Sequence, residues 1–118
     1  MNKKVNNILK LYSDLSINPK ECFCQLRKFY NLSVEDFLER SKLSHKVYDN
    51  IIGGKKISKI SCIKMCHGFS LPVTVMKKVL SIFGYNLNEN DINDAEILFK
   101  YEKYLAKFPP LWWESILN

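Results

Sequence analysis

Apolar residues recur along the chain at intervals of three and four, the spacing that places side chains on one face of an α-helix. The pattern begins at Val5, Ile8, Leu9 and Tyr12 and extends to a last long helix predicted for residues 91–107. No stretch alternates apolar and polar residues as a half-buried strand does, and no Asn-Gly pair marks a hairpin. The sequence therefore predicts an all-α fold.

Prolines, glycines and capping residues divide this pattern into separate helices. Pro19 suits the first turn of a helix, Ser33 and Ser44 suit N-caps, and Gly53-Gly54 suits a helix end. A further helix is predicted for residues 60–69. The residues expected to point toward the core are Phe23, Leu26, Phe29, Tyr30, Phe37, Leu38, Val47, Tyr48, Ile51, Ile60, Ile63, Cys66, Val75, Val79, Leu80 and Phe83.

The composition excludes several classes of protein. Of the 118 residues, 47% are hydrophobic and 13% are aromatic, which is too apolar for an intrinsically disordered chain and suits one compact domain. No apolar run reaches the roughly 18 residues that a membrane span needs, so no membrane partner is expected. The N-terminus lacks the apolar core of a secretory signal. The expected location is therefore cytoplasmic.

The excess of positive over negative charge lies entirely in one half of the sequence. Residues 1–60 carry 12 basic and 6 acidic side chains, whereas residues 61–118 carry 6 of each, so the first half holds the whole net charge of +6. A one-sided basic surface attracts polyanions and gains free energy when it releases their counterions. This segregation favours a surface that faces a polyanion over a simple abundance of lysine.

The cysteines and histidines do not form a convincing chemical site. Cys62 and Cys66 share a helical face, but the Cys22-x-Cys24 spacing fits structural zinc poorly, and small thiols are common in helical cores. His67 is expected to be a packed or rim residue. No Ser/His/Asp or Cys/His arrangement and no glycine-rich phosphate loop is present. We therefore expect no metal, no cofactor, no catalytic residues and no enzyme activity.

Residues 23–57 carry the strongest functional signal. Two short capped helices, separated by a break at residues 41–43, are typical of a helix-turn-helix unit, although a plain helical hairpin would also fit. In a helix-turn-helix unit the second helix enters the major groove of DNA and the first crosses the backbone.

Over this segment the chain resembles the lambda-repressor-like, Xre-type family of bacterial and phage regulators. The resemblance is carried by residues 26–37, 54–56, 70–72 and 83–88 together with Leu43, Ser44 and Ile51. It implies a lambda-repressor-like five-helix domain that binds operator double-stranded DNA as a homodimer, without a cofactor. Under this resemblance residues 1–18 are an extra N-terminal helix, residues 19–88 the helix-turn-helix domain, and residues 89–118 a C-terminal helix with a Trp-containing tail.

The resemblance also implies a set of DNA-binding residues and a transcription regulator of the repressor type, carried by a phage or mobile element. The recognition helix would run from Ser44 to Ile52, where Lys46 can reach guanine and Asn50 can pair with adenine. The residues expected to face the groove are Ser44, His45, Lys46, Asp49 and Asn50. Phosphates would be held by Lys42, Lys55, Lys56 and the backbone N–H groups near Val34.

Four residues favour an alternative function on the same scaffold. The family often has glutamine at position 34, alanine at position 38 and glycine at position 42, where this chain has Val34, Leu38 and Lys42. Asp49 would place a negative charge toward a polyanion. The alternative is a protein-binding module, such as a phage-encoded, anti-CRISPR-like inhibitor of a host nucleic-acid-targeting defence complex.

The tail contains both tryptophans of the chain, Trp112 and Trp113. One interpretation is that the tail folds back and covers the core. The other is that the tryptophans anchor an interface between protomers, because tryptophan is enriched in interface hot spots.

Overall fold

The computed structural model describes residues 9–107, and these residues form helices and connecting segments without any strand. Residues 9–13 are helical. The helices that follow are α2 (Pro19–Tyr30), α3 (Val34–Ser41), α4 (His45–Ile52), α5 (Lys59–Phe69), α6 (Val73–Ile82) and α7 (Ile92–Lys107). The all-α prediction is confirmed. Within the described residues, no helix combines the length and the apolar character that crossing a membrane requires.

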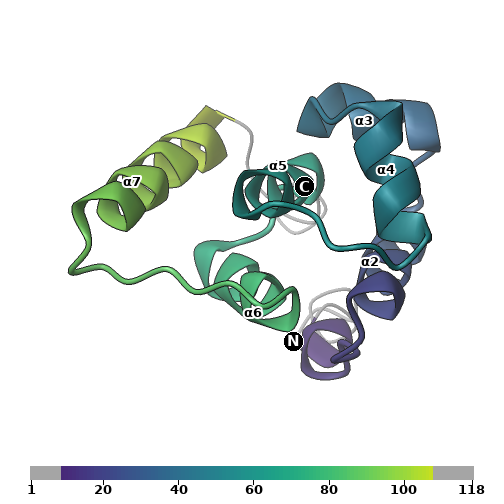
Figure 1. Ribbon diagram of the computed structural model, residues 1–118, viewed down its shortest axis with the longest axis horizontal. Helices are drawn as coiled ribbons and strands as arrows, with labels where there is room; N and C mark the ends of the chain where they lie inside the picture. Colours follow the sequence, from purple (N-terminus) through teal and green to yellow (C-terminus); the bar gives the residue numbers. More distant parts are fainter. Residues whose placement is uncertain (1–8, 108–118) are drawn as a thin grey trace, which may run out of the picture.

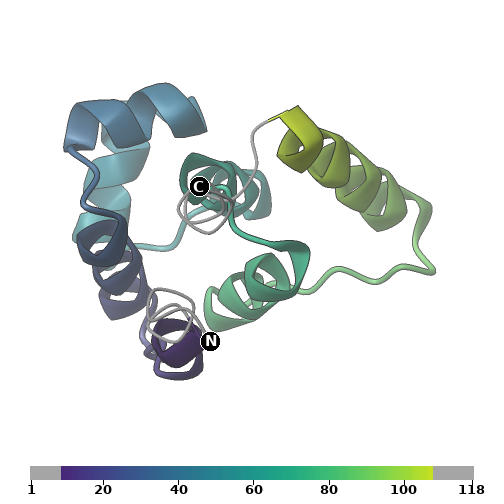
Figure 2. The same ribbon diagram turned by 180° about the vertical axis from the view of Figure 1, so that it is seen from behind.

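Helix α5 lies in the middle of the molecule, with the other helices around it (Figures 1 and 2). It contacts α2, α3 and α6. Helix α7 lies on the side of α5 opposite to α3 and α4 and is reached from α6 by an extended connection (Figure 1). The predicted helix-turn-helix segment and α7 are therefore separated by the central helix.

The helix starts follow from local capping chemistry. Asn18, Ser33, Ser44 and Ser58 precede α2, α3, α4 and α5, and the side-chain oxygen of each accepts a backbone N–H from the first turn. The Ser33 and Ser44 caps measure 3.1 and 3.3 Å. The predicted starts at Pro19, Ser33 and Ser44 are confirmed.

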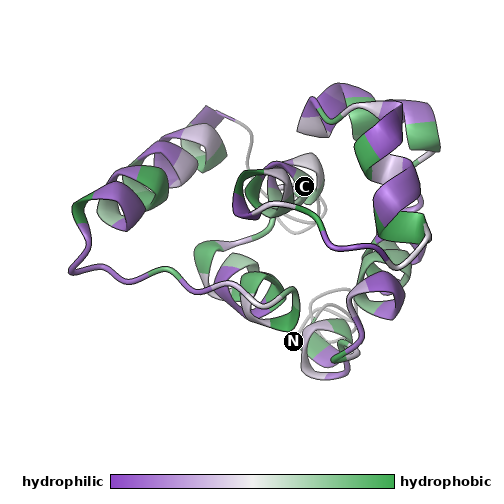
Figure 3. Cartoon of the chain, in the orientation of Figure 1, coloured by the Kyte–Doolittle hydropathy of each residue, from purple (hydrophilic) through white to green (hydrophobic). Residues whose placement is uncertain are grey.

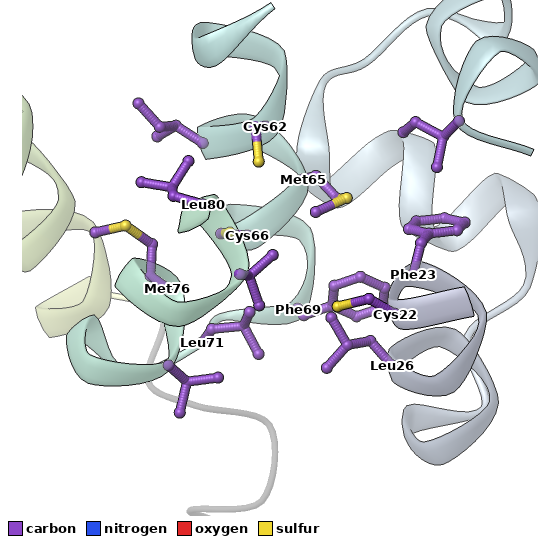
Figure 4. Packing of buried hydrophobic residues seen from close by; sticks show 14 of the residues in the cluster. Cys22, Phe23, Leu26, Cys62, Met65, Cys66, Phe69, Leu71, Met76 and Leu80 are labelled. Carbon is purple, nitrogen blue, oxygen red and sulfur yellow. The ribbon is translucent and has the colours of Figure 1, made fainter. Parts of the chain in front are cut away.

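The core is built around aromatic rings contributed by four helices. The Phe37 ring lies 5.1 Å from both Phe23 and Phe69, centroid to centroid, and Tyr48 lies 5.8 Å from Phe23. Aliphatic and sulfur-containing side chains of α2, α5 and α6 continue this core (Figure 4). Gly68 allows α3 and α5 to approach closely, because a Cβ there would lie 2.9 Å from the Phe37 ring.

Two of the predicted core residues are exposed, so those predictions are wrong. Ile60 is 54% exposed and Phe29 is 37% exposed. Helix α5 packs on its neighbours through the face that holds Ile63 and Cys66, and Ile60 in its first turn borders an open pocket instead. The Phe29 ring lies edge-on against its neighbour Tyr30, which in turn stacks on Phe69. The remaining predicted core residues are buried or half-buried.

Candidate nucleic-acid interface

The turn between α3 and α4 consists of Lys42, Leu43 and Ser44. Leu43 is buried and fixes the turn against the core, whereas Lys42 and Ser44 are exposed. Ser41, also buried, accepts the N–H of Leu43 through its hydroxyl at 3.3 Å. The turn is therefore held from inside, and its outer side is accessible to solvent.

Helix α4 presents its N-terminal end and one polar face outward. Ser44, His45, Lys46 and Asp49 are exposed and Asn50 is half-buried. Hydrophilic residues run along α4 and into the loop that follows it (Figure 3). The opposite face carries the buried residues Tyr48 and Ile51. The predicted groove-facing residues thus lie together on one side of α4.

The inner face of α4 is anchored by a contact that the sequence did not reveal. Nη1 of Arg27 on α2 donates to the Tyr48 hydroxyl oxygen at 2.5 Å, and the guanidinium lies 5.9 Å from the centre of the same ring. Tyr48 also packs against Phe23 and Phe37. These contacts fix the orientation of α4 about its axis, which decides which residues it exposes.

The loop after α4 holds the predicted basic residues at the surface. Lys55 and Lys56 are exposed, and Gly54 adopts a φ of 74°, which favours glycine. Ile57 is buried, and its carbonyl oxygen accepts the Tyr85 hydroxyl at 2.6 Å. Since Tyr85 comes from the segment after α6, the loop is tied to a distant part of the chain.

A third lysine adjoins the basic loop. Lys20, in the first turn of α2, lines the same hollow of about 290 Å³ as Lys55 and Lys56. The three side chains give this part of the surface a concentrated positive charge. Lys20 was not among the predicted site residues, because only the packing of α2 beside the loop brings it there.

The predicted phosphate contacts near α3 are less favourable. Val34 is half-buried and packs against the core, and the exposed carboxylates of Glu35 and Asp36 stand in the same first turn. Those carboxylates suit the positive end of the helix but repel phosphate. Lys42 is exposed and borders a pocket that also involves α5 and α7.

The lysines of this surface are available for an anion. Within residues 9–107, the ion pairs are Lys59–Asp94, Lys77–Glu89 and Lys100–Glu96, and none of them involves Lys46, Lys55 or Lys56. A polyanion bound here would therefore not have to displace a carboxylate of the described part of the chain.

Lys42 adopts a left-handed backbone conformation, with φ 61° and ψ 23°, as the C-cap of α3. This conformation costs an L-residue about 1–2 kcal/mol, and glycine is free of that cost. We expect Lys42→Gly to raise the free energy of unfolding by about 0.5–1 kcal/mol, because the greater entropy of unfolded glycine offsets part of the gain. Urea denaturation followed by circular dichroism measures the change. A loss of stability would contradict the assigned strain.

Three of the four cysteines, Cys22, Cys62 and Cys66, lie near enough to one another in the core to interact electrostatically. Cys22, Cys62 and Cys66 are buried, whereas Cys24 is exposed, and all are free thiols. Burial raises the pKa of the Cys22 thiol to about 12, so it stays protonated at neutral pH. No group of three or more potential ligands for a metal ion occurs in the described part of the chain.

Comparisons with known proteins leave the family open. The chain matches no protein-family model, and no curated protein or solved structure is significantly similar to it. The lambda-repressor-like resemblance therefore stays a prediction. The interface predicted for Trp112 and Trp113 lies outside the described residues.

Proposed function

We propose that the protein binds double-stranded DNA through α3 and α4, as a helix-turn-helix regulator of the lambda-repressor-like type. The observation that supports this most strongly is the presentation of α4. Its capped N-terminal end and the side chains of His45 and Lys46 are exposed, while Tyr48 and Ile51 anchor the helix to the core. A recognition helix needs this combination, because its first residues contact base edges and its inner face must not move.

Affinity would come from phosphate contacts. Lys46 on α4 and the exposed lysines Lys55 and Lys56 can each neutralise a phosphate and release counterions, and Lys20 adjoins the last two. These contacts position a protein on DNA but carry no sequence information.

Sequence preference would come from a few side chains of α4. At a matching site Lys46 can donate to the O6 and N7 atoms of guanine in place of a phosphate, and Asn50 can pair with the N6 and N7 atoms of adenine. His45, next to the cap, is exposed and can donate or accept a hydrogen bond. A homodimer would read two such half-sites about one helical turn apart.

Selection from a pool of random duplexes tests this proposal. The wild-type chain is expected to enrich a short motif. Lys46→Ala and Asn50→Ala are each expected to bind the selected duplex about tenfold more weakly, since a good base contact contributes about 1–3 kcal/mol of discrimination. Lys103→Ala, an exposed lysine on α7, is the control and should bind as the wild type does. Fluorescence anisotropy measures the dissociation constants.

One observation favours a second candidate, a protein-binding module that uses the same surface. Asp49 is exposed on the outer side of α4, and Glu35 and Asp36 are exposed at the start of α3. Mixed charges of this kind suit a protein partner better than a phosphate backbone. Failure of the random pool to yield any motif, together with recovery of a stoichiometric protein partner, would favour this candidate over DNA binding.

A further inference from the structure

A pocket of about 500 Å³ lies between α3, α5 and α7, on a part of the surface that the proposed DNA contacts of α4 do not use. Its apolar wall is formed by Ile60, Ile63, Ile97, Tyr101 and Tyr104. The volume falls within the range of pockets that hold small molecules in proteins, about 300–1,000 Å³. The exposure of Ile60, unexpected from the sequence, follows from its place at this opening.

Helix α7 forms one wall of the pocket and is fixed firmly in place. The Tyr101 hydroxyl donates to the Leu71 carbonyl oxygen at 2.6 Å, and the Tyr104 hydroxyl donates to the His67 carbonyl oxygen at 3.0 Å. Near its first turn, Asp94 pairs with Lys59 of α5 at 2.8 Å. Since α7 is tied to α5 at both ends, the space between these helices belongs to the folded molecule.

The His67 ring forms part of the pocket lining. Its Nε2 atom is buried and makes no hydrogen bond within the described residues. The imidazole ring stacks against Tyr101 at 4.7 Å and Tyr104 at 4.2 Å, and burial lowers its pKa, which favours the neutral form. Since Nε2 is closed off from solvent, His67 contributes its aromatic ring to the lining rather than a hydrogen bond.

The rim of the pocket is positively charged. Arg40, Lys42, Lys64 and Lys100 line it together with one carboxylate, Glu39. Arg40 is engaged by Gly68 and Ser70, and Lys100 pairs with Glu96. Lys42 and Lys64 are exposed and form no ion pair within residues 9–107, so they remain available for an anionic group.

We infer that this pocket binds a small aromatic anion, a ring system that carries a carboxylate or sulfonate. The rings lie against Ile60, Ile97 and Tyr104, and the anionic group faces Lys42 and Lys64. This site uses none of the residues of α4 and its following loop to which the proposed DNA contacts are assigned and does not depend on them, although Lys42 on its rim was also predicted to hold a phosphate. A neutral ligand would leave the two lysines unused, and a cation would be repelled by them.

Two fluorescent probes with the same ring system test the site in the full chain. Anilinonaphthalene sulfonate is an aromatic anion, and N-phenylnaphthylamine is its neutral counterpart. The wild type is expected to bind the anionic probe more tightly than the neutral one. Lys64→Glu should raise the dissociation constant of the anionic probe about five- to tenfold and that of the neutral probe less than twofold, because only the charge interaction changes. Lys103→Glu, the same charge change on α7 outside the pocket lining, should alter neither.

A second pair of variants locates the rings. Ile60→Trp places a larger side chain in the pocket and should raise the dissociation constants of both probes at least tenfold. Ile92 is 83% exposed and lies outside the pocket lining, so Ile92→Trp should leave both dissociation constants unchanged. Because both positions are exposed, the variants are expected to unfold as cooperatively as the wild type.

Several results would overturn the inference. One is that the folded chain binds neither probe. Another is that Ile60→Trp leaves both affinities unchanged, and a third is that Lys64→Glu and Lys103→Glu have equal effects on binding of the anionic probe. Probe release as the protein concentration rises would mean that a second copy covers the pocket. Tighter probe binding after joint replacement of Trp112 and Trp113 by alanine would mean that the tail of the chain occupies it.

Discussion

Replacement of Phe37 by alanine is expected to lower the free energy of unfolding by about 3–5 kcal/mol. Phe37 is fully buried on α3, and its ring packs against Phe23, Phe69 and Tyr48. A Cβ added at Gly68 would lie 2.9 Å from this ring, so α3 and α5 are already in close contact here. The two helices therefore have little freedom to move together and fill the cavity that alanine would leave. Urea denaturation, followed by the helical circular dichroism signal, measures the change.

Two further variants keep this prediction testable if the alanine variant does not fold. Phe37→Leu keeps most of the volume and should cost less than the alanine substitution. Leu38→Ala, at the half-buried neighbouring position, is the matched control and should cost clearly less than Phe37→Ala. Equal losses at positions 37 and 38 would contradict the central place given to Phe37 in the core.

The second large effect concerns the basic loop. Joint replacement of Lys55 and Lys56 by glutamate is expected to weaken duplex DNA binding about 100-fold at physiological salt, because two phosphate contacts are lost and two repulsive charges are added. Both side chains are exposed, so the fold should be unaffected. Fluorescence anisotropy with a labelled duplex measures the affinity, and circular dichroism checks the fold.

A matched control separates this surface from the net charge of the protein. Lys103 and Lys107 are exposed on α7, and their joint replacement by glutamate makes the same change in charge on the side of α5 opposite to α4. That variant should lose less than tenfold in affinity. Equal losses of affinity in the two double variants would show that DNA binding depends on the net charge of the protein alone. That result would contradict an interface on α4 and its following loop.

The features that the sequence predicted correctly are local ones. A serine cap acts within its own first turn, so the helix starts at Ser33 and Ser44 could be predicted from a few neighbouring residues. The exposed and buried faces of α4 follow from helical periodicity in the same way, since Tyr48 and Ile51 are three apart.

The features that the sequence did not predict depend on contacts between distant residues. Arg27 and Tyr48 are 21 residues apart, and Ile57 and Tyr85 are 28 apart, so nothing in the local pattern pairs them. The exposure of Ile60 has the same origin. Its spacing fits the helical pattern, but which side of α5 is covered depends on where α3 and α7 pack.

The salt dependence of DNA binding is a direct test of phosphate contacts by the lysines of α4 and its following loop. The dissociation constant of the full chain for a mixed-sequence duplex would be measured between about 50 and 200 mM salt. If Lys46, Lys55 and Lys56 each neutralise one phosphate, the affinity should fall by about 50-fold over this range. An affinity that stays constant would contradict DNA binding through these lysines, because no phosphates would then be neutralised by them.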